Sequence, residues 1–113
     1  MADPTSERAR IERQMRKGML GVAALAALRQ EPAHGYGLAQ RLKAVLGANV
    51  AEGTLYPLLA SFEAAGWITF HWDTQHTGPA RKVLSLTDEG RKAAADMLAL
   101  WRETAGKIED MAP

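Results

Sequence analysis

Basic side chains are clustered at two places in the chain. One pair, Arg81 and Lys82, follows a Gly-Pro turn in the second half. The other group lies within residues 8–17, where Glu12 is the only acidic residue, and it comprises Arg8, Arg10, Arg13, Arg16 and Lys17. Local positive charge suits a polyanion such as a nucleic acid, although a solvated helix face explains the larger group equally well.

The chain as a whole is nearly neutral, so this basic excess is local. Its 113 residues carry a formal charge of +1, and residues 1–30 hold six basic and three acidic side chains. With 47% hydrophobic and 24% charged residues, the composition is that of one small globular domain. The chain has no cysteine, which excludes disulfides and zinc–thiolate sites and fits a cytoplasmic location.

Nothing in the sequence indicates catalysis, a metal or a cofactor. We find no paired carboxylates, no Ser/His/Asp arrangement and no glycine-rich phosphate loop. His71 and His76 flank Asp73, but a zinc site would need a fourth ligand that the sequence does not offer. We therefore expect a binding protein and not an enzyme.

The uncharged run at residues 18–28 follows arginines and resembles a signal peptide or a membrane segment. A bilayer span needs about 20 apolar residues, so this run is too short. Glu7 and Glu12 also interrupt the basic region that a signal peptide would have. We expect a buried helix here and no membrane partner.

Hydrophobic periodicity predicts a mainly α-helical chain with one small β-hairpin. We expect helices at residues 8–30, 35–46, 52–65 and 88–110 and strands at 68–73 and 81–86, with Thr87 capping the last helix. Pro57 should place the start of the third helix near Gly53 or Thr54, because proline is poorly tolerated deep in a helix. The residues expected to face inward on the first three helices are Ile11, Met15, Met19, Val22, Ala26, Leu28; Leu38, Leu42, Val45; and Leu55, Leu58, Leu59, Phe62.

Three helices followed by a hairpin form a winged helix-turn-helix. The second and third helices would be the helix-turn-helix and the hairpin the wing. Residues 1–86 would then form the DNA-binding region and residues 87–113 a C-terminal dimerisation helix, within one compact domain.

The expected outer face of the third helix is made of small and hydroxyl-bearing residues. It carries Gly53, Thr54, Tyr56, Pro57, Ala60, Ser61 and Ala64. Such a face can approach a DNA groove closely and offers hydroxyls to bases or phosphates, although a plain solvent-facing surface remains the alternative. Because this helix has no Lys or Arg, positive charge would have to come from Arg41 and Lys43, from the wing and from the N-terminal arginines.

The last helix carries a heptad seam. Its members, spaced four and three residues apart, are Gly90, Ala94, Met97, Trp101, Thr104, Ile108 and Met111. No later element can cover the seam, so a second copy of the chain is the expected partner, with packing onto the first helix as the alternative. The wide ring of Trp101 lies among small residues and is either core or the wall of a cavity for flat aromatic ligands.

Several strings in the sequence, in this order, resemble the PadR family of bacterial transcriptional regulators. The resemblance covers about residues 15–110, and Gly-Thr-Leu-Tyr-Pro at 53–57 is its most characteristic part. The strings are His34-Gly35-Tyr36-Gly37-Leu38, Glu52 to Leu59, Glu63 to Gly66, Gly78-Pro79-Ala80-Arg81-Lys82 and Leu86 to Gly90.

The resemblance implies a homodimeric winged-helix repressor that binds an inverted-repeat operator in double-stranded DNA. The third helix would enter the major groove and the wing would touch the flanking backbone. The residues expected at the DNA are Tyr36, Arg41, Lys43, Thr54, Tyr56, Pro57, Ser61, Arg81 and Lys82. The residues expected at the dimer contact are Ala94, Met97, Trp101, Thr104, Ile108 and Met111.

The short last helix resembles the subfamily with multidrug-responsive regulators, in which a tryptophan lines a pore between subunits. The resemblance therefore implies a small aromatic effector, with Met15, Met97 and Trp101 as its expected contacts. Two departures stand out: Ala51 replaces a serine that often caps the third helix, and Val83 and Leu84 replace paired aromatics after the wing's Arg-Lys. The rival functions are a winged helix for protein–protein contacts and a small-molecule sensor without direct operator binding.

Overall fold

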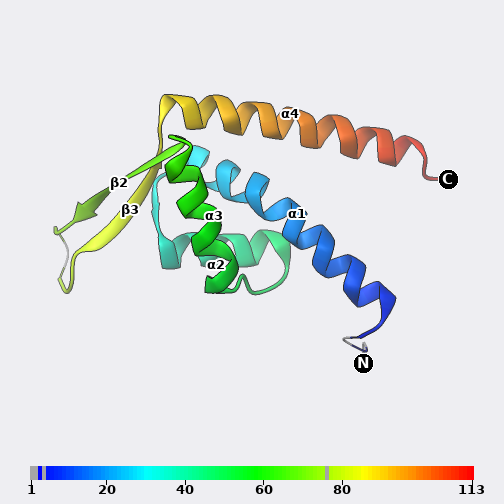
Figure 1. Cartoon of the computed structure of the whole chain (residues 1–113), viewed down its shortest axis with the longest axis horizontal. Helices are drawn as coiled ribbons and strands as arrows, with labels where there is room; N and C mark the ends of the chain where they lie inside the picture. Colours follow the sequence, from blue (N-terminus) through cyan, green and yellow to red (C-terminus); the bar gives the residue numbers. More distant parts are fainter. Residues whose placement is uncertain (1–2, 4, 76) are drawn as a thin grey trace.

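The computed structural model describes residue 3, residues 5–75 and residues 77–113. Figure 1 shows a helical body and a projecting hairpin. In chain order the elements are α1 (Glu7–Gln30), β1 (Ala33–His34), α2 (Gly35–Leu46), α3 (Glu52–Ala64), β2 (Ile68–Asp73), β3 (Arg81–Leu86) and α4 (Asp88–Asp110). The predicted mainly helical winged fold is confirmed, and the predicted elements agree with these bounds to within a residue.

Side chains cap three of the four helices at their first turns. Ser6 accepts a hydrogen bond from the backbone N–H of Ala9, and Thr87 accepts one from Gly90 at 3.0 Å. The N-cap of α3 is Ala51, which makes no side-chain hydrogen bond, as the sequence indicated. Gly47 ends α2 with a φ of +72°, a conformation that glycine adopts without the strain a side chain would cause.

The start of α3 differs slightly from the expectation based on its proline. The helix begins at Glu52, so Pro57 is its sixth residue and lies in the second turn. Proline there lacks the N–H that would bond to the carbonyl of Gly53. The helix continues across this position because Leu55 and Leu59, on its buried side, anchor it to the core.

The sheet has three antiparallel strands in the order β1-β3-β2. In the wing, Ile68 lies opposite Leu86 and Asp73 opposite Arg81. The sequence did not predict β1, which pairs Ala33 with Leu84. A two-residue strand has no periodicity of its own, and only its pairing with β3 makes it extended.

The core lies around the second half of α1, where this helix meets α2, α3 and the base of the wing. Its largest fully buried side chains are Leu25, Leu38, Leu42 and Leu55. The predicted inner face of α1 is confirmed only in its second half, where Leu28 is buried and Met19, Val22 and Ala26 are partly buried. Ile11 and Met15 are exposed, and the buried residues are Leu20, Ala24, Leu25, Ala27 and Leu28. Both α2 and α4 contact α1, so its covered surface is wider than one stripe.

On α2, Val45 was expected in the core but is 72% exposed. Leu46 packs against the core in its place, one turn after Leu42. The inner face of α3 was predicted correctly, since Leu55, Leu59 and Phe62 are buried and Leu58 is partly buried.

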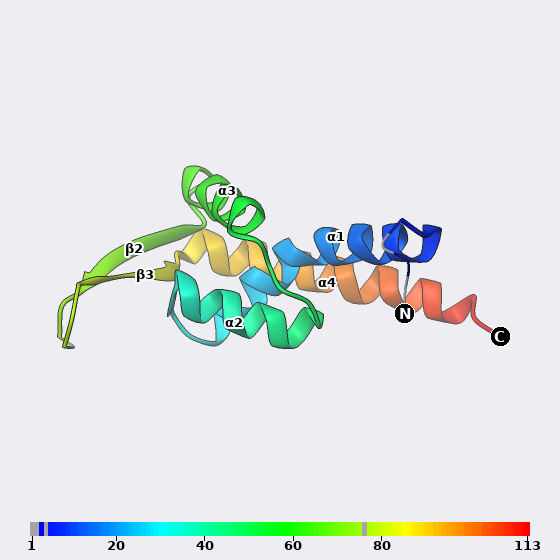
Figure 2. The ribbon, with the colours of Figure 1, turned by 90° about the horizontal axis from the view of Figure 1, so that it is seen from below.

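Two helical arms extend beyond the core on the same side of the molecule (Figures 1 and 2). We call residues 7–17 the α1 arm and residues 98–111, the end of α4 with its C-cap residue Met111, the α4 arm. The arms diverge from each other in Figure 1, and the C-terminus lies at the tip of the α4 arm. Within the described residues, no helix combines the length and the apolar character needed to cross a membrane.

Candidate nucleic-acid interface

The outer face of α3 is exposed as the sequence predicted. Its exposed members, all small, hydroxyl-bearing or proline, are Gly53, Thr54, Tyr56, Pro57, Ala60, Ser61 and Ala64. The Ser61 hydroxyl donates to the carbonyl of Leu58 at 2.7 Å, which leaves its lone pairs for an outside donor. These seven residues therefore offer a closely approachable surface without a basic side chain, and the exposed acidic Glu63 lies beside Ala60 on the same helix.

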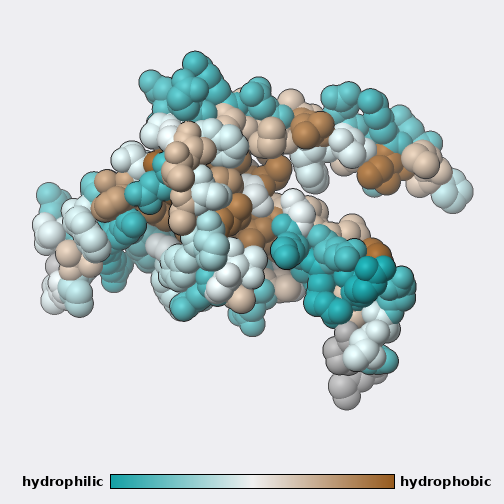
Figure 3. Space-filling view, in the orientation of Figure 1, coloured by the Kyte–Doolittle hydropathy of each residue, from teal (hydrophilic) through white to brown (hydrophobic). Residues whose placement is uncertain are grey.

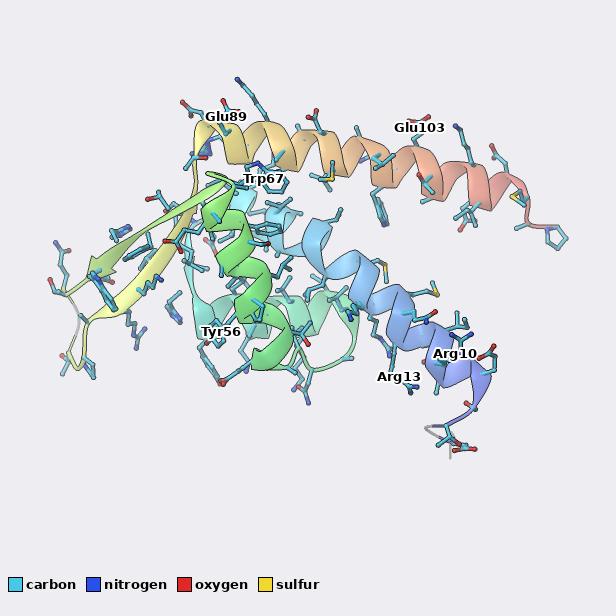
Figure 4. All side chains as sticks on the ribbon, in the orientation of Figure 1. Arg10, Arg13, Tyr56, Trp67, Glu89 and Glu103 are labelled. Atoms are coloured by element: carbon cyan, nitrogen blue, oxygen red, sulfur yellow. The ribbon has the colours of Figure 1, made fainter. Side chains whose placement is uncertain are left out.

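Tyr56 joins α3 to the beginning of α2 (Figure 4). Its ring lies so near Gly35 that a Cβ on this glycine would be 3.3 Å from the Tyr56 hydroxyl. A larger residue at position 35 would make the Tyr56 ring shift by a few tenths of an ångström, and Tyr56 is itself 48% exposed. Tyr36, the second residue of α2, is 71% exposed beside it. Both tyrosines line the same groove, at the N-terminus of α2.

His34 ties the beginning of α2 to the wing. Its Nδ1 accepts a hydrogen bond from the backbone N–H of Gly37 at 3.1 Å, which makes it the N-cap of α2. Its Nε2 lies 3.5 Å from a guanidinium nitrogen of Arg81. The sequence analysis did not assign His34 a role, although its place directly before a glycine-rich helix start was the available signal.

A groove of about 810 Å³ runs between α3, the start of α2 and the wing. Its walls include Tyr36 and Tyr56 on the helical side and Arg81 and Lys82 on the wing side. The one acidic side chain among its described lining residues is Glu63 of α3. Four of the predicted DNA contacts thus lie around one concave surface, with positive charge on the wing side only.

Arg41 lies in a different place from the other predicted contacts. Its Nη2 donates to the carbonyl of Ala27 and to the side-chain oxygen of Gln30, both at 2.8 Å. Its Nη1 lies 3.9 Å from Glu31. These partners hold Arg41 against the end of α1, so its charge is largely engaged within the chain. Lys43 is exposed on α2.

The N-terminal arginines are partly paired with acidic side chains. Glu12 accepts from Arg8 at 2.9 Å and lies 3.8 Å from Arg16, while Arg10 pairs with Glu7. The hydrogen bond from Arg10 holds the pKa of Glu7 below its usual value. The net positive charge of the α1 arm is therefore smaller than a count of arginines indicates.

Part of this basic cluster nevertheless lies beside the start of α3. A second hollow, of about 320 Å³, separates α1 from the turn before α3. Arg13, Arg16 and Lys17 line one side, and Ala51 and Thr54 line the other. The start of α3 thus has a basic neighbour on the side away from the wing.

The residues of the heptad seam divide into two groups. Ala94 has no exposed surface, and Gly90 is buried, because the first turns of α4 pack inside their own chain. The prediction that Ala94 contacts a partner is therefore wrong. Met97 packs partly against the chain's own core. The exposed members, all on the α4 arm, are Trp101, Thr104, Ile108 and Met111.

The α4 arm, which carries the exposed part of the seam, lies on the same side of the molecule as the α1 arm (Figure 1). In Figure 3 hydrophobic surface borders the gap between the arms. Met15, one of the expected effector contacts, is 58% exposed, and Trp101 is 46% exposed. Ile11 and Leu100, which no prediction assigned to a site, are 41% and 56% exposed. His76, which the sequence analysis considered as a metal ligand, lies outside the described residues.

Comparison with known proteins decides the family. The model of the transcriptional regulator PadR-like family matches residues 24–96, which include α2, α3 and the wing. The chain belongs to the PadR-like family of transcriptional regulators. The PadR-like match thus covers every element around the 810 Å³ groove.

Solved structures agree with this PadR-like assignment. A PadR-like transcription factor from Bacteroides fragilis is 34% identical, with 91% of this chain and 99% of that chain covered and a TM-score of 0.71. A PadR-family regulator from Eggerthella lenta is 29% identical, with coverages of 98% and 93% and a TM-score of 0.79. A PadR-like regulator from Bacillus cereus is 28% identical, with coverages of 87% and 95% and a TM-score of 0.79. No curated protein sequence matches the chain significantly.

Proposed function

We propose that this PadR-like regulator is a homodimeric repressor that binds an inverted-repeat operator and is released by a small aromatic effector. The observation that carries the DNA-binding part is the groove between α3 and the wing. The closely approachable face of α3, with Glu63 as its one acidic lining residue among those described, borders it on one side, and Arg81 and Lys82 border it on the other. A duplex can therefore present base edges to α3 and phosphates to the wing.

The basic side chains on the two sides of α3 fit a contact with the phosphate backbone of DNA. Arg81 and Lys82 are exposed on the wing, and Arg13, Arg16 and Lys17 line the hollow on the other side of Thr54. Phosphate contacts on both sides would position the helix, while its hydroxyls read the bases. Tyr36 and Tyr56 add two hydroxyl groups at the start of α2 for the same strand.

The proposed dimer rests on the exposed hydrophobic surface of the two arms. Exposed side chains of this size, brought together on adjacent helices, mark interaction sites in soluble proteins. They are Ile11, Met15, Leu100, Trp101, Ile108 and Met111. A second copy that inserts its α4 arm between the arms of the first would cover these side chains. The first copy would cover the same side chains of the second in the same way. Such a two-fold contact would also present two α3 helices to an inverted repeat.

The proposed effector site lies at the same contact. The ring of Trp101 is exposed on the α4 arm, and the thioether side chain of Met15 is exposed on the α1 arm. The α4 arm of a second copy would enclose both side chains. An apolar, aromatic-walled space of this kind suits a flat hydrophobic ligand. Met97, which packs partly against the core, would form the inner end of that space.

A mobility-shift assay tests the function as a whole. The probe is a duplex of about 200 base pairs from upstream of the chain's own coding sequence, and a coding-region duplex of equal length is the comparison. We expect the upstream duplex to shift at lower protein concentration by at least tenfold, as specific binding exceeds non-specific binding. Equal affinity for both, or no shift, would favour a winged helix that serves protein–protein contacts.

A further inference from the structure

One face of the wing carries two exposed aromatic rings and a lysine. In the strand register, Phe70 lies opposite Leu84 and Trp72 opposite Lys82. Side chains directly opposite each other share a face, so these four residues lie on the same side of the hairpin. Phe70 is 38% exposed and Trp72 is 60% exposed.

The Phe70 ring contacts both Trp72 and Lys82. The rings of Phe70 and Trp72 meet edge to face, with 6.2 Å between their centroids. The Nζ of Lys82 lies 4.0 Å from the centroid of the Phe70 ring. Lysine over an aromatic face is attracted by the ring electrons, so Phe70 holds this charge beside Trp72. We call Phe70, Trp72 and Lys82 the aromatic face of the wing.

The aromatic face continues the groove beside α3. Ile68 and Leu84 on the same side of the sheet line the groove, as does Lys82 itself. The hairpin then extends beyond α2 and α3 (Figures 1 and 2), so this surface runs outward from the groove toward the tip of the wing. Asp73 pairs with Arg81 in the register and belongs to the opposite side of the hairpin, so the aromatic face carries no acidic side chain among the described wing residues.

We propose that Trp72 packs against the deoxyribose of a DNA strand next to the major-groove site, with Lys82 beside the neighbouring phosphate. The proposal rests on the DNA-binding function proposed above. A duplex strand presents apolar sugar faces between charged phosphates, which matches a ring beside a cation. Aromatic and apolar side chains inserted at the minor groove supply affinity in other DNA-binding proteins without reading the sequence.

The distribution of charge favours this occupant over a protein partner. The outer face of α3 has no basic residue, Arg41 is engaged within the chain, and three arginines of the α1 arm have acidic partners. Affinity for DNA therefore needs a contribution that does not come from those charges. An aromatic contact supplies it, and its strength should not depend on salt, because no counterion is released when a ring covers a sugar.

The experiment compares three single variants of the full chain by fluorescence anisotropy with a labelled upstream duplex and a random duplex of equal length. We expect Trp72→Ala to weaken binding to both duplexes by about tenfold, because the apolar surface of the ring and of the sugar would no longer be buried. Trp72→Phe should restore most of the loss. His71→Ala is the matched control, because His71 is exposed on the same strand and belongs to the other face. It should change either affinity by less than about twofold.

Salt titration separates this contact from electrostatic ones. The slope of log affinity against log salt should be unchanged in Trp72→Ala and lower in Lys82→Ala. A second measurement uses native fluorescence: DNA should change the tryptophan emission of the unmodified chain, and Trp72→Phe should remove most of that change.

The outcomes distinguish the two proposals. Binding of the unmodified chain to neither duplex would overturn the DNA-binding function and this contact together. Normal DNA binding with an unchanged Trp72→Ala affinity would overturn the contact alone and would leave the aromatic face to a protein partner. An equal loss in His71→Ala would also contradict it, because the effect would not belong to one face of the wing. Unchanged thermal unfolding in all three variants is the check that the fold is intact.

Discussion

Gly90 and Trp67 meet at a distance that only a glycine allows. A Cβ built on Gly90 would lie 1.9 Å from the carbonyl oxygen of Trp67. The same carbonyl accepts a hydrogen bond from the backbone N–H of Thr87 at 2.9 Å, and the Thr87 hydroxyl donates to the carbonyl of Gly66 at 2.5 Å. The start of α4 is thereby attached to the turn that follows α3 (Figure 4).

We therefore expect Gly90→Ala to destabilise the protein. The added methyl must displace backbone, which costs about 1–3 kcal/mol or more in the free energy of unfolding. Urea unfolding followed by circular dichroism measures the change. Gly106→Ala is the control, since nothing lies within 4 Å of its Cβ position and it lies outside the heptad seam. That variant should gain up to about 1 kcal/mol from helix propensity, and a Gly90→Ala variant of normal stability would contradict the contact.

The wing should contribute to the salt dependence of DNA binding. Replacing Arg81 and Lys82 by alanine removes two charges per chain and four per dimer. The slope of log affinity against log salt should then flatten by as much as about 3.6. Lys92→Ala, a charge removal on α4, is the control. If the slope of the double variant equals that of the unmodified chain, the wing does not contact phosphates.

Thr54 should contribute to the choice of sequence. It is exposed near the start of α3 and its hydroxyl is the first on the outer face. We expect Thr54→Ala to lower the preference for the operator over random DNA by about 1–3 kcal/mol if a base contact is lost. Thr54→Ser keeps the hydroxyl and should retain most of the preference. The ratio of the two dissociation constants is the measurement, and a constant ratio in Thr54→Ala would exclude a base contact.

The dimer should depend on the tip of the α4 arm. Ile108 and Met111 are 61% and 83% exposed, and replacing both by glutamate would place unpaired charges in the proposed contact. Burying those charges is strongly unfavourable, so sedimentation velocity should detect monomers. Val45→Glu is the control, because Val45 is similarly exposed but lies on α2, outside the proposed contact. A folded dimer of Ile108→Glu/Met111→Glu would place the interface elsewhere.

Trp101 should report the binding of flat aromatic compounds. Saturable quenching of tryptophan fluorescence is expected when such a ligand enters the space between the arms. Trp67 and Trp72 also emit, so Trp101→Ala identifies the responding ring. We expect this variant to bind at least tenfold more weakly, since one stacking wall is lost. Undiminished binding would mean that the effector site does not include Trp101.

The sequence predicted the elements of this fold well because their ends carry local signals. Thr87 caps α4, Gly47 ends α2, and the change of period after Gly66 marks the wing, all within a few residues of the feature itself. The outer face of α3 was likewise predictable, since its leucines define one buried side. The buried face of α1 was not, because its apolar run has no polar side and two neighbouring helices share it.

The residues that were misplaced depend on contacts distant in the chain. Arg41 is held by Ala27 and Gln30, which no pattern around Arg41 reveals. Ala94 and Ile108 have the same heptad spacing, yet the first is covered by its own chain and the second is exposed. The role of His34 as a cap near Arg81 needed the pairing of β1 with β3. Hydrophobic periodicity shows which side of a helix is apolar, but it does not show which part of the structure covers that side.

The helix α1 passes without interruption from the α1 arm into the middle of the core. Its 24 residues make a rod of about 36 Å, with Leu25 and Leu28 fixed among the buried side chains and Ile11 free at the other end. A rigid helix that is held near one end pivots about that end. In the dimer proposed above, a change in the angle between the arms would therefore rotate each winged unit about that fixed end and change the distance between the two α3 helices.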